Sequence, residues 1–198
     1  MGHRLLGVAM PLALFVAASC ASEAPARDEA APAAPPVVEA PNPIPAGALP
    51  GRPSKVVELD AAGLAADSID TASLETLLID AGFVAGTERR FSKTADGRRR
   101  VTARVLAFET AQGAERYLAW LAGHVAEIIG DAEAIQDPRT PAGGVVFVHE
   151  PTGCCHLETR LFLGAWRHDA TVLTLKVGGQ SIRLGAVLGF VSMLDAAV

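Results

Sequence analysis

The sequence predicts an α+β domain with a largely antiparallel sheet of about five strands and helices packed on one face. Two patterns carry this prediction: apolar residues recur at helical spacing in some segments and alternate with polar residues in others. Helices and strands also follow one another in the order α-β-β-α-β-β-β-α, which is typical of antiparallel sheets. The expected elements are a helix over 70–81, strands over 83–91 and 100–108, a helix over 110–129, strands over 145–149, 157–166 and 170–177, and a helix from residue 181.

Capping residues and apolar stripes mark the helices. Asp70 is a plausible N-cap of the first helix and Gly82 its stop, while Thr110 caps the second. In the last helix Gly185 and Gly189 form a GxxxG spacing, which in a domain of this kind indicates close packing. The apolar residues expected to face the core are Leu74, Leu77, Leu78 and Ala81 in the first helix, Ala114, Tyr117, Leu118, Leu121, Val125, Ile128 and Ile129 in the second, and Leu184, Val187, Leu188, Val191 and Leu194 in the last.

Turn residues join the strands into hairpins. Asp96-Gly97 is a hairpin signal between the first two strands. Residues 167–169 would form a three-residue loop between the last two strands. That loop places Leu163 opposite Leu173, on an apolar face.

The N-terminus has the features of an export signal. Residues 1–4 are short and basic, and 5–18 form an apolar run of about 14 residues, too short to span a ~30 Å hydrocarbon core. Small residues at 17–19 then precede Cys20, and this arrangement resembles the lipobox of bacterial lipoproteins. The resemblance implies that 1–19 are a signal peptide and that Cys20 is lipidated, anchoring the chain to the extracytoplasmic face of the cell membrane. An ordinary secreted protein cut near Ser22 is the alternative.

A tether follows the signal. Residues 21–54 hold ten alanines and nine of the chain's 13 prolines. A segment of this composition buries too little apolar surface on folding to offset the loss of chain entropy. We therefore expect 20–54 to be a disordered Ala/Pro-rich tether and 55–198 to be a single α+β domain. This element order on an Ala/Pro tether resembles small exported lipoprotein domains of high-GC Gram-positive bacteria, some of them PsbP-like, and the resemblance assigns no functional residue.

Charge and motif content argue against two classes of function. The chain has 17 basic and 22 acidic residues and a formal net charge of −5, whereas nucleic-acid binders normally carry a basic excess. It lacks a Walker A motif, a dinucleotide-binding glycine fingerprint, a GxSxG elbow and an HExxH motif. We expect neither a nucleic-acid partner nor enzymatic activity.

A basic cluster gathers near the tip of the first hairpin. It allows two interpretations: contact with an anionic surface, or a solvated hairpin that resists edge pairing, which we favour. The cluster consists of Arg89, Arg90, Lys93, Arg98, Arg99 and Arg100.

The segment 149–156 is the most unusual passage. Cys154 and Cys155 are adjacent, and an exported protein meets an oxidising compartment. A vicinal disulfide, two reduced packed thiols, an intermolecular bridge and a metal site all remain open. If 151–154 is a hairpin loop, His149 lies opposite His156, and two imidazoles with nearby thiolates suit zinc or copper.

These observations support two function hypotheses. The first is a membrane-anchored extracytoplasmic lipoprotein whose domain is a non-catalytic binding or assembly module, with an unidentified protein, lipid or small molecule as partner. The second is a metal-binding or thiol-redox envelope protein that uses His149, Cys154, Cys155 and His156.

Mass spectrometry of the protein under non-reducing conditions tests the second hypothesis. A Cys154–Cys155 disulfide lowers the mass by that of two hydrogen atoms, and a metal site adds one zinc or copper ion to the native mass. Two free thiols that bind neither metal would contradict the hypothesis.

Overall fold

The computed structural model describes residues 40–92, 99–151, 159–180 and 182–198, which all belong to one compact unit. No helix within these residues is long and apolar enough to cross a membrane. The elements are β1 (Arg52–Pro53), β2 (Val57–Leu59), α1 (Ala61–Ala65), α2 (Thr71–Asp80), β3 (Phe83–Ser92), β4 (Arg99–Phe108), α3 (Ala111–Gly123), α4 (Val125–Ile129), β5 (Glu133–Ile135), β6 (Val145–His149), β7 (Arg160–His168), β8 (Thr171–Gly179) and α5 (Leu184–Asp195).

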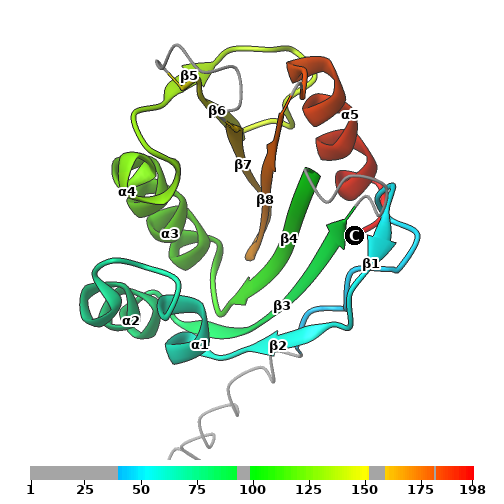
Figure 1. The fold of residues 1–198 in the computed structure, drawn as a ribbon. Coiled ribbons are helices and arrows are strands. Elements are labelled where there is room, and N and C mark those ends of the chain that lie inside the picture. Colours follow the sequence, from blue (N-terminus) through cyan, green and yellow to red (C-terminus); the bar gives the residue numbers. More distant parts are fainter. Residues whose placement is uncertain (1–39, 93–98, 152–158, 181) are drawn as a thin grey trace, which may run out of the picture. The chain divides into compact units, whose positions relative to one another are not determined.

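The α+β class and the antiparallel sheet are confirmed. Within the described residues the sheet has eight strands in the order β1-β3-β4-β8-β7-β6-β5, with β2 also paired to β3 (Figure 1). The three strands beyond the expected five are β1, β2 and β5. Each has only two or three residues, too few to show the period-two alternation from which strands are recognised.

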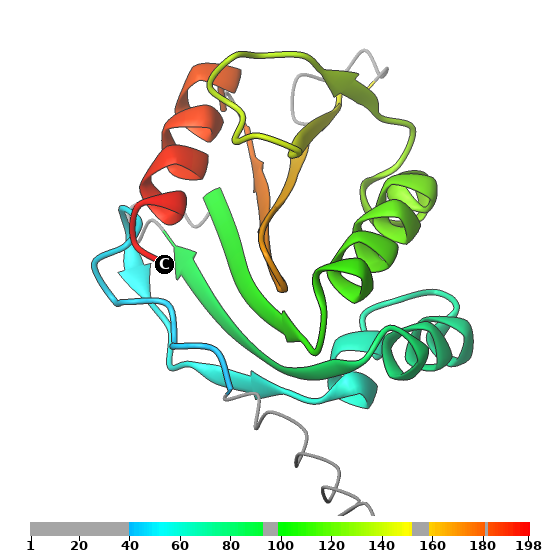
Figure 2. The ribbon, with the colours of Figure 1, turned by 180° about the vertical axis from the view of Figure 1, so that it is seen from behind.

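Helices cover both faces of the sheet, so the expectation of helices on one face is wrong. Helices α1 to α4 lie on one side and α5 on the other (Figures 1 and 2). The cause is visible in β8, where Leu173, Leu175 and Val177 join the core beneath α5 while Val172 joins the core beneath the other helices. A central strand that is apolar on both faces requires a cover on each side.

The register between β7 and β8 also differs from the expectation. Leu173 pairs with Trp166, and Leu163 pairs with Lys176. The connection is a two-residue turn at 169–170, in which Asp169 adopts φ 48°. Because this turn is tighter than the expected three-residue loop and lies further along the chain, Leu163 and Leu173 point to opposite faces.

The helix expected over 110–129 is broken at His124. The Thr110 side chain caps its start by accepting from Gly113 N at 3.0 Å. His124 leaves helical geometry, at φ −113° and ψ 14°, and its ring Nδ1 lies 2.8 Å from the Trp120 carbonyl oxygen. The two rings are stacked at a centroid distance of 4.5 Å.

The described fold begins upstream of Lys55, where the sequence analysis starts the domain. Ile44 is 1% exposed and Leu49 is 3% exposed, and both pack in the core beneath α5. These apolar residues lie in a proline-rich stretch whose composition resembles a tether, which is why the sequence places the boundary too late.

Two helical glycines give a matched stability prediction. A Cβ at Gly113 would lie 1.9 Å from the Ala81 carbonyl oxygen, whereas within the described structure a Cβ at exposed Gly185 or Gly189 meets nothing within 4 Å. The close packing inferred from the GxxxG spacing is therefore wrong. We expect Gly113→Ala to lower the free energy of unfolding by about 1–3 kcal/mol and Gly189→Ala to raise it by about 0.5–1 kcal/mol.

Urea denaturation of both variants checks this pair. A Gly113→Ala variant as stable as the native chain would show that α3 and the end of α2 do not approach so closely.

Candidate functional site

A cleft with a volume of about 660 Å³ lies on the face of the sheet that α1 to α4 cover. This volume falls within the ~300–1,000 Å³ range typical of small-molecule sites. Its walls come from α1 and α2 on one side and from α3 and α4 on the other, and its floor from β3, β4, β8 and β7. The cleft is the candidate functional site.

The floor exists because one face of the sheet changes from apolar to polar along the strands. At one end of β4 and β8 this face carries Leu106 and Val172, which are fully buried beneath the helices. Further along the same face come Thr102 and Arg100 on β4 and Lys176 on β8, which line the cleft. Polar side chains do not support helix packing, so the sheet stays uncovered there.

An apolar wall faces this polar floor. A row of ring contacts leads into it: Phe108 contacts Tyr117 at 5.6 Å between centroids, Tyr117 contacts Trp120 at 6.2 Å, and Trp120 stacks on His124. Packing therefore holds the two cleft-lining rings, Tyr117 and Trp120, in place. The apolar lining residues are Leu64, Leu74, Tyr117, Trp120, Leu121, Ile128, Leu161 and Leu163.

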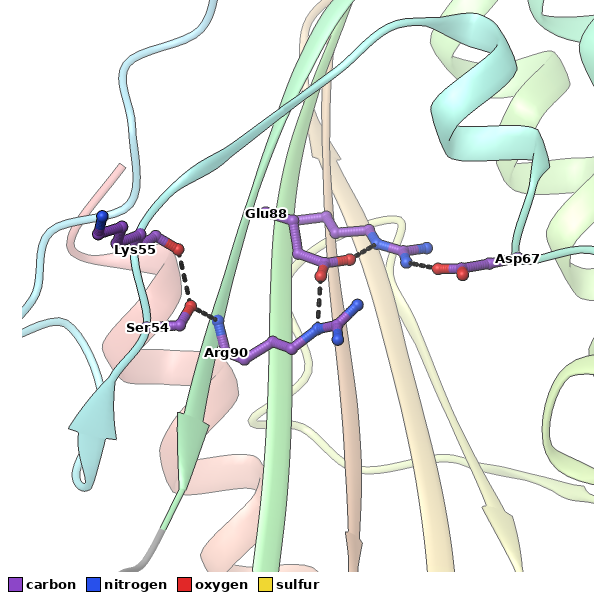
Figure 3. A network of polar contacts seen from close by, with 6 residues as sticks. Ser54, Lys55, Asp67, Glu88 and Arg90 are labelled. Atoms are coloured by element: carbon purple, nitrogen blue, oxygen red, sulfur yellow. Dashed lines mark hydrogen bonds and ion pairs between the residues drawn. The ribbon is translucent and has the colours of Figure 1, made fainter.

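A buried carboxylate orders the polar side of the floor. Glu88 is 3% exposed, and its two oxygens accept from Arg90 Nε and Arg104 Nε, each at 2.7 Å (Figure 3). Arg104 also pairs through Nη2 with Asp67, on the segment after α1. Burial alone would lower the pKa of Arg104, but the charge and hydrogen bond of Glu88 outweigh burial and raise it. Glu88 thus fixes the direction of both guanidinium groups, and Asp67 also holds that of Arg104.

A serine ties the segment before β2 to the same strand. Ser54 Oγ accepts from Arg90 N at 3.0 Å and donates to the Lys55 carbonyl oxygen at 2.7 Å (Figure 3). β3 is therefore held through its backbone, at Arg90 N, and through the ion pairs of the Glu88 and Arg90 side chains.

Four cations surround Thr102 on the floor. Thr102 pairs with Arg90 on β3 and with Lys176 on β8, and Arg100 and Arg104 flank it on the same face of β4. Within the described residues, Arg100 and Lys176 have no ion-pair partner. Lys176 Nζ donates to the Ile128 carbonyl oxygen at 3.0 Å. Desolvation in the cleft and the positive charge of Arg104 lower the pKa of Lys176.

Most of this site could not be predicted from the sequence. The signal for Lys176 was present, since it interrupts the apolar strand 170–177. The basic cluster predicted for the first hairpin combines Arg90 and Arg100 with Arg89. Arg89, however, pairs with Ala103, which lies in the core beneath α5. Arg89 therefore lies on the opposite face, and 93–98 lie outside the described residues.

Of the proposed metal and redox residues, only His149 lies in the described part of the chain. Cys154, Cys155 and His156 lie outside it, as does the proposed lipidation site Cys20. His149 pairs with Leu161, and its Nδ1 lies 2.7 Å from the Asp131 carbonyl oxygen. Residues 152–154 of the loop that would place it opposite His156 lie outside the described part of the chain. Among the described residues, no group of three or more His, Cys, Asp or Glu side chains is placed to hold a metal ion.

Comparison with known proteins shows similarity in fold alone. No protein family model matches the chain, and no curated protein matches it. Among solved structures, the chain is similar to the extracellular domain of PknH from Mycobacterium tuberculosis. The sequences are 16% identical, the match covers 74% of this chain and 84% of that one, and the TM-score is 0.50.

The cleft wall gives a prediction in alkaline solution. Burial raises the pKa of Tyr117 to about 12 from its ordinary 10.0, although the charge of Arg104 acts in the opposite direction. Between these values the unfolded chain has lost the proton and the folded chain still holds it, so this group makes stability fall as the pH rises. Tyr117 is the chain's single tyrosine, so tyrosinate absorbance reports it alone. We expect a native midpoint near pH 12 and one near pH 10 in denaturant.

The Tyr117→Phe variant should show no tyrosinate signal at all. A native midpoint near pH 10 would contradict the burial of Tyr117 in the cleft wall.

Proposed function

We propose that this chain is a lipid-anchored extracytoplasmic domain that binds a small molecule in the cleft without chemically changing it. The cleft carries the proposal, since it combines sufficient volume with an apolar wall and a few converging polar groups, the usual composition of a ligand site.

The organisation of the floor favours binding over catalysis. Glu88, the most deeply buried carboxylate there, already accepts from two guanidinium groups and so has no free oxygen to act as a base. The residues that line the cleft in the described structure include no histidine or cysteine. General acid–base and nucleophilic catalysis most often depend on such groups.

The N-terminal sequence supports an extracytoplasmic location. The signal-like segment 1–19 followed by Cys20 resembles a lipoprotein export signal, and the structurally similar PknH domain is extracellular. Several acyl chains on Cys20 would anchor the chain stably without a transmembrane helix. A long Ala/Pro-rich segment after Cys20 would let the cleft reach ligands near that surface.

Occlusion of the cleft tests the binding function. The probe is N-phenyl-1-naphthylamine, an uncharged aromatic compound that fluoresces when it enters an apolar site. Thr102→Phe should weaken its binding about tenfold, because filling the floor removes about 50 Å² of apolar contact at roughly 25 cal/mol per Å². Ser68→Phe, in the α1–α2 wall, should also weaken binding of the probe.

Thr171→Phe is the matched control, since Thr171 is a partly exposed threonine of β8 that does not line the cleft. Its probe affinity should equal that of the native chain. Failure of the native chain to bind the probe, or equal losses in Thr102→Phe and Thr171→Phe, would overturn the proposal.

A further inference from the structure

We infer that the cleft selects an anionic amphiphile, with the anionic group over Thr102 and the apolar portion over β7 beneath α3 and α4. This inference rests on the proposed binding function and names the class of ligand. Its basis is the way the sheet register separates charge from apolar surface along one row of residues.

That row crosses four neighbouring strands. Arg90 on β3 pairs with Thr102 on β4, Thr102 with Lys176 on β8, and Lys176 with Leu163 on β7. Directly paired side chains lie about 4.5–5.5 Å apart at Cβ and on the same face. The row therefore passes from cationic to apolar within the width of a single small molecule.

The cationic end is built around a small neutral residue. Thr102 lies between Arg90 and Lys176 across the strands, and between Arg100 and Arg104 along β4. Positions two apart on a strand are separated by about 6.8 Å. Arg100 and Lys176, which have no ion-pair partner in the described structure, therefore lie beside a group held above Thr102, while Arg90 and Arg104 stay paired with Glu88. Guanidinium groups bind carboxylate and phosphate with two parallel hydrogen bonds, and the ammonium adds a compact charge.

The carboxylates of the region leave part of this charge uncompensated. Glu88 lies on the same face of the sheet, opposite Arg104, and pairs with Arg90 and Arg104, and Asp67 also pairs with Arg104. Glu127, the remaining acidic residue of the lining, lies on an exposed position of α4. Arg100 and Lys176 therefore face the cleft with no carboxylate partner in the described structure, in a chain whose formal net charge is −5.

The apolar end suits a hydrocarbon or aromatic group. Leu163 continues the row, and Trp120, Leu121 and Ile128 approach it from α3 and α4. Leu163 and Leu121 are 4% and 3% exposed and form the base of this end, while the partly exposed Trp120 and Ile128 offer apolar surface of the kind that a fatty chain or ring system buries. A purely inorganic anion would leave this surface in water, and an uncharged hydrocarbon would leave the cations without a partner.

Two probes that share an aromatic skeleton test the charge preference. They are 8-anilino-1-naphthalenesulfonate, which is anionic, and N-phenyl-1-naphthylamine, which lacks the sulfonate. The native protein should bind the anionic probe more tightly. Lys176→Met should weaken the anionic probe about tenfold, as loss of one charged hydrogen bond implies, and at least fivefold more than it weakens the neutral probe.

Lys55→Met is the matched control, because it removes the same charge from an exposed lysine outside the cleft lining. It should leave the affinity for both probes unchanged. Thr102→Phe should weaken both probes. Displacement of the anionic probe by dodecanoate and by dodecyl phosphate, compared with dodecyltrimethylammonium, then distinguishes a carboxylate ligand from a phosphate ligand.

Several outcomes would overturn the inference. If the neutral probe binds as tightly as the anionic one, or if Lys176→Met weakens both equally, the cleft binds apolar molecules without regard to charge and only the proposed function survives. Equal displacement by dodecyltrimethylammonium has the same meaning. If neither probe binds the native protein, the proposed function fails as well.

Discussion

The buried carboxylate of Glu88 is the constraint on which the cleft depends. At 3% exposure its negative charge is tolerable only with cationic partners, and Arg90 and Arg104 supply them at 2.7 Å each. The pairing directs two guanidinium groups along the floor and, through Asp67, ties β4 to the segment after α1. One acidic residue thus fixes the side chains and the wall position that define the polar half of the site.

The site also follows from a property of the sheet as a whole. The face beneath α5 is apolar from Leu173 through Leu175 to Val177, and these residues belong to a buried core. The opposite face is apolar only as far as Val172 and then turns polar at Thr174 and Lys176. Stability is therefore concentrated on one face and at one end of the other, and the remaining surface is free to bind a ligand.

Much of the fold could be predicted from local sequence signals. The caps at Asp70 and Thr110 locate two helices, because a side-chain acceptor before an apolar stripe has a direct local meaning. The register of β7 and β8 could not be predicted, since a two-residue turn at 169–170 and a three-residue loop at 167–169 suit the same sequence. With this error in register, Leu163 is predicted on the α5 face of the sheet, so the floor of the cleft cannot be predicted. Lys176 was a visible exception in an apolar strand, but its neighbours across the sheet depend on that register.

Binding of an amphiphile in the cleft through its anionic group can be tested at the two tryptophans. Trp120 lines the cleft and Trp166, the chain's other tryptophan, is fully buried, so the two indole N–H signals in a proton–nitrogen NMR spectrum report on the site and on the core separately. Titration with dodecanoate should shift the Trp120 signal saturably and leave the Trp166 signal stationary. Dodecyltrimethylammonium should cause no such shift. A Trp120 signal that does not respond to dodecanoate, or that responds equally to both amphiphiles, would contradict binding of an anionic amphiphile in the cleft.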